Sequence, residues 1–214
     1  MKRLAPLTGV LFFLVLLGSV LSNSNDLDAS SSGAKVLAHY RAHQNSTAIS
    51  GILTVHAIVV GLIFYGQLRD YLRRHEGSRG LAATAFGGAI LFAVSGGISA
   101  GVDFAVTDSP SHLSLSSAQT LNLINMDVAN GLEFAGVAIL LVTFGAAILA
   151  GGLLPAWLGW IAFPLAVVAV VPPIAFIAFI GVGVWTLVVS IVMWQRSADS
   201  VLAAGGAVAA GSPT

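Results

Sequence analysis

The sequence contains no cysteine, and this absence excludes disulfides, thiolate metal sites and cysteine nucleophiles. Charged residues are also scarce: they make up 8% of the 214 residues, where a soluble globular domain has roughly 25%. Hydrophobic residues account for 57% of the chain, too many to bury in one water-soluble core. The net charge is zero, and no basic motif predicts nucleic-acid binding. These features together predict a protein whose solvent is the lipid bilayer.

Six apolar segments approach the roughly 20 residues that a helix needs to cross a bilayer. Backbone polar groups must be satisfied inside lipid, so each segment should be a helix. We therefore expect an all-α fold, an integral membrane bundle of six transmembrane helices in one domain over residues 1–196. A low-complexity tail at 197–214 is expected to be disordered. The predicted spans are 4–21, 48–68, 81–102, 131–154, 156–171 and 174–194.

The placement of lysine and arginine predicts the orientation of these spans. Cytoplasmic loops carry an excess of basic residues, and seven of the nine fall on one side of the predicted membrane. Only Lys35 and Arg41 fall on the other side. Both termini are therefore expected in the cytoplasm of a cell whose plasma membrane holds the chain. The seven basic residues are Lys2, Arg3, Arg69, Arg73, Arg74, Arg79 and Arg196.

The first apolar segment has a second interpretation. The stretch "MKRLAPLTGVLFFLVLLGSVLS" has the basic start, apolar core and small residues of a signal peptide, although no Ala-x-Ala site follows. Retention as a helix is favoured, and cleavage would leave five spans. Two polar segments, 23–47 and 103–130, are predicted outside the cell. The first shows helical periodicity with Val36, Leu37 and Tyr40 on one side, and the second contains "SSAQ" (116–119), a helix-start pattern. A helix that begins there could continue into the fourth span.

The third predicted span contains a small residue at every fourth position. Lipid provides no hydrophobic force between helices, so close backbone approach through small side chains is a main route to packing. We interpret the repeat as a contact stripe on one face and expect a neighbouring helix against it. The stripe consists of Ala85, Ala89, Ala93, Gly97 and Gly101.

Three ionisable residues within or beside the spans are candidate functional residues. His56 lies well inside the second span, where an ionisable side chain is a functional hypothesis by default, although hydrogen bonding to a neighbouring helix is the simpler role. Glu133 stands near the outer border of the fourth span, and Asp103 ends the third. If the fourth span begins early, Glu133 could meet His56 in the outer half of the bundle.

No pattern predicts catalysis, a cofactor or a metal centre. The sequence contains no Gly-x-Ser-x-Gly elbow, phosphate-binding loop or His-Glu-x-x-His motif. His39 and His43 share a helix face and could join carboxylates at a metal, but no fixed metalloprotein spacing supports this. The basic cluster could attract anionic lipid at about 1 kcal/mol per residue. That cluster comprises Arg69, Arg73, Arg74 and Arg79.

Several stretches resemble uncharacterised multi-pass membrane proteins of actinobacteria that form a family of unknown function. These stretches are "RLAPLTGVLFFLVLLGSVL", "AKVLAHYRAH", "LRDYLRRHEG" and "LPAWLGW". The resemblance implies a six-span bundle in the plasma membrane and implies no functional residue.

The sequence therefore predicts a non-catalytic structural or accessory protein of the plasma membrane, with the lipid bilayer as its main partner. An alternative is a small transporter or channel-like carrier with a polar path near His56 and Glu133. A weaker alternative is an extracytoplasmic metal-binding membrane protein.

Overall fold

A computed structural model describes residues 5–22, 27–108, 112–171 and 174–210, with side chains from 6 to 196. Every regular element in these residues is helical, which confirms the all-α prediction. The longer helices are α1 (Thr8–Ser22), α3 (Gln44–Leu72), α4 (Arg79–Asp108), α6 (Asn130–Gly151), α7 (Ala156–Ala169) and α8 (Ala175–Ala210). The shorter ones are α2 (Gly33–Ala42), α5 (Leu115–Leu123), 3-10 turns at Ala5–Leu7 and Glu76–Ser78, and a π-helical segment at Ile124–Ala129.

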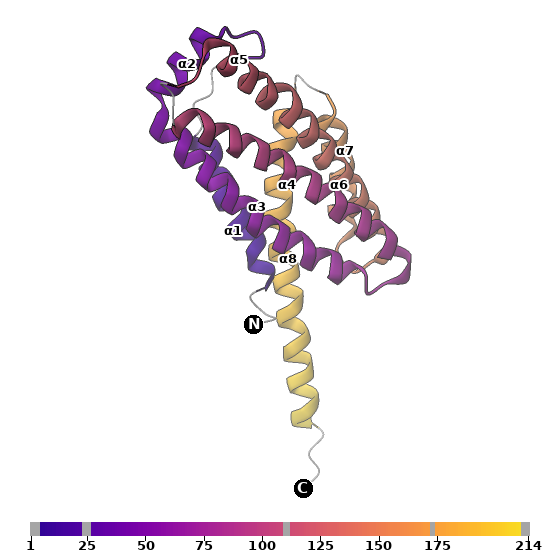
Figure 1. Ribbon diagram of the computed structural model, residues 1–214. Helices are drawn as coiled ribbons and strands as arrows, with labels where there is room; N and C mark the ends of the chain where they lie inside the picture. Colours follow the sequence, from indigo (N-terminus) through magenta and orange to yellow (C-terminus); the bar gives the residue numbers. More distant parts are fainter. Residues whose placement is uncertain (1–4, 23–26, 109–111, 172–173, 211–214) are drawn as a thin grey trace.

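The six longer helices form a closed ring. Each packs against the next in chain order, from α1 to α3, α4, α6, α7 and α8, and α8 returns to α1. Helices α2 and α5 lie together at one end, whereas α1 begins and α8 leaves the bundle at the opposite end (Figure 1). We refer to α2 and α5 as the cap, and to the two ends of the bundle as the cap end and the opposite end.

The prediction of long apolar helices is confirmed, but the predicted number of six spans is corrected to four. Of the helices that the structure describes, four are long and apolar enough to cross a membrane: Gln44–Leu72, Glu76–Asp108, Leu115–Gly151 and Ala175–Arg196. Helix α1 has 15 residues and α7 has 14, so α7 is only roughly 21 Å long against a hydrocarbon core of about 30 Å. The physical reason at α7 is the following Pro172-Pro173, since a residue before proline avoids the helical conformation.

The cap is built as the periodicity predicts. Val36, Leu37 and Tyr40 of α2 are buried, and they pack with Val102 and Val106 of α4 in a small apolar cluster. Helix α5 begins after Ser114, two residues earlier than the predicted start at Ser116. The Ser114 hydroxyl accepts a hydrogen bond from the Ser117 amide. The chain then runs as one continuous helix from Leu115 to Gly151, which confirms that a cap helix continues into the fourth predicted span.

The predicted stripe on α4 is only partly a contact. Ala85 and Ala89 are buried, but Gly97 and Gly101 are exposed, and a methyl group added at either would meet nothing within 4 Å. The physical reason is helical drift: four residues turn an α-helix by about 400°, so a four-residue repeat moves around the helix by about 40° per step. Ala93, at the middle of the repeat, is partly buried.

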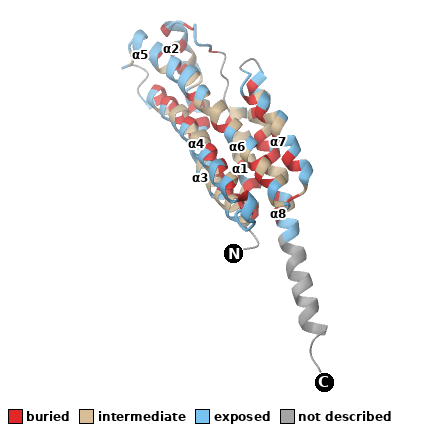
Figure 2. Ribbon diagram, turned by 90° about the vertical axis from the view of Figure 1, so that its right-hand side faces the viewer, coloured by how far each residue is buried: buried red, intermediate tan, exposed pale blue. Residues whose placement is uncertain are grey.

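The close approach of α4 and α6 occurs instead at Gly88 and Gly136. A Cβ at Gly88 would lie 2.6 Å from the Leu140 nitrogen, and one at Gly136 would lie 2.5 Å from the Phe92 nitrogen. Each glycine thus leaves space for the other helix's backbone, which is the small-residue packing expected in lipid. Figure 2 shows buried positions along the inner faces of the bundle and exposed ones outside.

Two predictions fall largely outside the described residues. The division of the last apolar run at Pro172-Pro173 lies between α7 and α8, and those two residues are not described. The predicted disordered tail begins at 197, from which point side chains are not described. The backbone of α8 continues as helix to Ala210. Disorder of the tail therefore stays a prediction.

Candidate functional site

A cavity of about 580 Å³ occupies the bundle between the cap and Tyr65. Helices α1, α3, α4, α6 and α8 contribute to its wall, together with α2 and the π-helical segment. Its volume lies within the range of about 300–1,000 Å³ that is typical of small-molecule sites. This cavity is the candidate site.

The face of α3 that lines the cavity changes from polar to apolar along the helix. Thr47, Ser50 and Thr54 line it near the cap, and Gly61 and Tyr65 line it farther in. The spacing of three, four, seven and four residues keeps these side chains on one helix face. The 18 residues from Thr47 to Tyr65 correspond to a rise of about 27 Å. The polarity of the wall therefore decreases with depth along α3.

Hydroxyl groups join α1 to α3 beside the cavity. The Ser19 hydroxyl lies 2.7 Å from that of Thr54 and 3.3 Å from that of Ser50, and it also donates to the Ser50 carbonyl. Ser50 donates in return to the Ser19 carbonyl. Sequence reasoning missed this network, although serine and threonine three or four positions apart within a span are the residues expected to link membrane helices.

The π-helical segment sets which side chains of the α5–α6 helix face the cavity. A π-helical turn inserts an extra residue, rotates the facing of every later residue in the helix, and occurs often at functional sites. Ser95 of α4 donates a 2.7 Å hydrogen bond to the Ala129 carbonyl at the end of this segment. Asn125, Asn130 and Glu133 all line the cavity. No feature of the sequence predicts the π-helical segment.

The structure brings Asp103 and Glu133 to the same cavity from two different helices. Asp103, on α4, is 9% exposed, and Glu133, on α6, is partly buried. Neither carboxyl group forms a hydrogen bond or ion pair within the part of the chain that the structure describes. Glu133 lies 18 residues into the continuous helix that begins at Leu115, and its place at the outer border of the membrane stays a prediction.

Tyr40 and His39 of the cap line the cavity at its polar end. Burial raises the pKa of Tyr40 to about 12, the negative charge of Asp103 adds to this rise, and a hydrogen bond from the side chain of Asn125 opposes it. The rings of His39 and His43 lie 4.5 Å apart, and His43 Nδ1 contacts the His39 carbonyl oxygen at 3.0 Å. His39 therefore belongs to the cavity, and His43 packs behind it.

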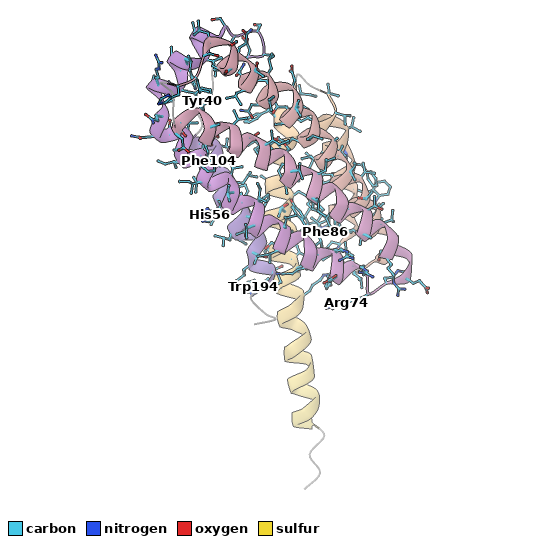
Figure 3. All side chains as sticks on the ribbon, viewed as in Figure 1. Tyr40, His56, Arg74, Phe86, Phe104 and Trp194 are labelled. Atoms are coloured by element: carbon cyan, nitrogen blue, oxygen red, sulfur yellow. The ribbon has the colours of Figure 1, made fainter. Side chains whose placement is uncertain are left out.

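His56 does not belong to this cavity. Its side chain is exposed on the outside of α3, and Nδ1 contacts the Ile52 carbonyl of the same helix at 2.7 Å. Figure 3 places it along α3, away from Tyr40 at the cap end. The hypothesis that His56 and Glu133 meet inside the bundle is therefore wrong, and the polar path that it implied is replaced by the cavity with Asp103 and Glu133.

Aromatic rings fill the centre of the bundle beyond the cavity. Tyr65 stacks with Phe144 at 6.0 Å between ring centroids, and Phe144 stacks with Trp185 at 6.3 Å. The Tyr65 hydroxyl lies 2.8 Å from the Thr186 hydroxyl, and Trp185 donates to the Leu158 carbonyl at 3.0 Å. We call Tyr65, Phe144 and Trp185 the aromatic core. The cavity therefore ends at Tyr65.

The predicted lipid-binding arginines lie at the opposite end of the bundle. Arg73, Arg74 and Arg79 are exposed, and the Arg74 guanidinium lies over the Tyr71 ring at 5.1 Å. Arg69 is partly buried, with its guanidinium 5.5 Å from the centre of the Phe86 ring and 3.7 Å from the carboxylate of exposed Asp70. The distance of the cluster from the cap is visible at Arg74 in Figure 3.

Comparison with known proteins leaves the chain without an assigned relative: no family model, curated protein or solved structure matches it. The resemblance to the actinobacterial membrane family therefore stays a prediction. Among the described residues, no group of three or more histidine and carboxylate side chains is arranged to hold a metal ion.

Proposed function

We propose that this chain is a non-catalytic plasma-membrane protein that binds a small molecule in its cavity, reached from outside the cell. The observation that carries the proposal is the cavity itself, about 580 Å³ in the middle of a closed helical ring. Sites of this kind are concave, mostly apolar, and contain a few polar groups that orient the ligand. Here the apolar walls come from the ring helices, and the orienting groups are Asp103 and Glu133.

The proposed orientation places the cap outside the cell and both termini in the cytoplasm. The excess of arginine between α3 and α4, at the end opposite the cap, supports this orientation. Four helices would cross the bilayer, and the shorter α1 and α7 would pack within the same ring. The arginine cluster would then contact anionic lipid of the inner leaflet.

Cysteine labelling tests both the orientation and the access to the cavity. The natural sequence has no cysteine, so each introduced thiol reports alone. In intact cells, a charged, membrane-impermeant thiol reagent should label Ser116→Cys on exposed α5 and Ser99→Cys in the cavity wall. Glu76→Cys, at the opposite end, should react only after permeabilisation.

Ala147→Cys, in the fully buried part of α6, serves as the matched control. It should stay unlabelled in both conditions. If Ser116→Cys reacts from outside but Ser99→Cys behaves like Ala147→Cys, the orientation stands and the externally reached cavity is refuted. Labelling of Glu76→Cys in intact cells would refute the orientation.

The aromatic core favours a binding protein, or a carrier that changes conformation, over an open channel. A channel needs a continuous polar path, whereas Tyr65, Phe144 and Trp185 occupy the bundle centre at 3% exposure or less. The transporter alternative survives only in this carrier form, with Asp103 and Glu133 in place of His56.

A further inference from the structure

Among the described residues, the cavity wall contains two acidic side chains, Asp103 and Glu133, and no lysine or arginine. His39 is the one lining residue of this part of the chain that could become cationic. Asp103 is nine-tenths buried and lacks a hydrogen-bond or ion-pair partner among the described residues. A buried carboxylate without a partner is costly, and a bound cation relieves that cost.

A single metal ion does not match the cavity. Calcium takes six to eight oxygen ligands, and magnesium requires an octahedral set at close distance. The described residues contain no group of three metal-binding side chains, and the volume of about 580 Å³ far exceeds that of one ion. The size is that of an organic molecule.

The aromatic residues of the wall match an organic ammonium group. Phe92, Phe176 and Phe179 line the cavity, with Phe92 and Phe179 edge to face at 6.1 Å and Phe176 and Phe179 stacked at 6.4 Å. Phe134 adjoins Glu133 in the same wall. Cations are attracted to the faces of aromatic rings, and quaternary ammonium ligands are commonly recognised in this way.

The decrease in polarity with depth indicates a ligand with two unlike ends. Asp103 and Asn125 line the part near the cap, Asn130 and Glu133 lie deeper along α6, and Gly61 and Tyr65 lie at the apolar end. An amphiphile would match this arrangement, with its charged group between the two carboxylates and its tail pointing toward the aromatic core. A wholly polar cation would leave the deeper part unfilled.

We propose that the cavity binds an organic ammonium compound with an apolar tail, its nitrogen held between Asp103 and Glu133 and its tail directed toward Tyr65. This inference rests on the proposed function, because it names the ligand class of the same cavity.

The test uses the full chain in nanodiscs of zwitterionic lipid and the probe octyltrimethylammonium, with binding measured by calorimetry against empty nanodiscs. The uncharged octanol, the anionic octanoate and the tailless choline are the matched ligands. Wild-type protein should bind the probe and bind each matched ligand more weakly. Asp103→Asn and Glu133→Gln should each weaken binding of the probe about thirtyfold or more, as expected when one member of a buried charge pair is removed.

Asp127→Asn is the control variant, because Asp127 lies in the same continuous helix but is exposed and outside the cavity. It should bind the probe like the wild type. Unfolding of each variant without ligand separates loss of binding from loss of fold. Ala93→Trp, which places an indole in the cavity wall, should abolish binding without any change of charge.

The outcomes separate the two proposals. If octanol or octanoate binds as well as the probe, and Ala93→Trp removes that binding, the cavity is a ligand site but the ammonium assignment is overturned. If no probe binds and Ser99→Cys also resists labelling, the proposed function fails as well. Probe binding that survives Asp103→Asn, Glu133→Gln and Ala93→Trp would be partition into the bilayer and would also overturn the inference.

Discussion

Tyr65 separates two regions of the bundle that hold their helices together differently. On the cap side the centre is a cavity, and α1 meets α3 through the hydroxyls of Ser19, Ser50 and Thr54. On the other side the aromatic core fills the centre with Phe144 and Trp185. Lipid does not drive helices together, so close packing must do so. The difference indicates that the filled side stabilises the ring, while the hollow side is available for binding.

The largest expected difference between the regions comes from removing an aromatic ring. Phe144 is fully buried between Tyr65 and Trp185, so Phe144→Ala should leave a cavity and lower the free energy of unfolding by about 3–5 kcal/mol. Phe134 is partly buried and already borders an empty volume, so Phe134→Ala should cost clearly less. Unfolding in mixed micelles measures both. Equal losses would contradict the division of the bundle into two regions.

A smaller effect is expected at the contact between α4 and α6. Gly88→Leu would drive a side chain into the α6 backbone, and overpacking of this kind costs about 1–3 kcal/mol. The matched variant Gly97→Leu alters the same helix where nothing lies within 4 Å, so its thermal stability should stay near that of the wild type. The opposite ranking would restore the four-residue stripe as the contact face.

The stripe illustrates what sequence reasoning could predict and what it could not. The long apolar helices and the amphipathic α2 were predictable, because length and periodicity against water identify them. The sequence could not show whether Gly97 and His56 point toward the core or toward the lipid. Both surroundings are apolar, so no periodicity marks the side of a span that faces the core. The same reasoning explains the missed Gly88–Gly136 contact, since glycines are frequent in every span.

Parts of the candidate site were visible in the sequence, and parts were not. Asp103 and Glu133 stood out as carboxylates among apolar residues, and the structure places both in one cavity. Their meeting depends on the ring order of α4 and α6 and on the π-helical turn before Asn130, neither of which has a local signature. The end of α7 was predicted to within two residues, because Pro172-Pro173 divides the last apolar run, but its 14 residues are too few to cross a bilayer.

Polar contacts in the two regions should differ by less than about 1 kcal/mol. The Tyr65–Thr186 pair is enclosed by the aromatic core, and a double-mutant cycle with Tyr65→Phe and Thr186→Val should give a coupling energy of about 0.6 kcal/mol, the average for membrane helices. In the Ser19–Thr54 cycle, Ser50 can replace the lost partner, so a lower coupling is expected. A higher coupling for Ser19 and Thr54 would show that the cavity side is held as rigidly as the core.

The smallest expected effect is the coupling between His56 and Glu133. His56 is exposed outside α3 and contacts its own helix at Ile52, whereas Glu133 faces the cavity. Side chains that share no partner usually act additively within about 0.3–0.5 kcal/mol. We therefore expect the stability changes of His56→Ala and Glu133→Gln to add in the double variant, with thermal unfolding as the measurement.

The same cycle can be repeated with Asp103→Asn in place of His56→Ala. Asp103 and Glu133 line one cavity, so their charges repel each other across it, and neutralising either carboxylate relieves the other. The second neutralisation should then gain less stability than the first, whereas no such dependence should occur with His56→Ala. Coupling of about 0.6 kcal/mol or more between His56 and Glu133 would show instead that α3 turns its histidine inward, and the assignment of the cavity to the two carboxylates alone would fail.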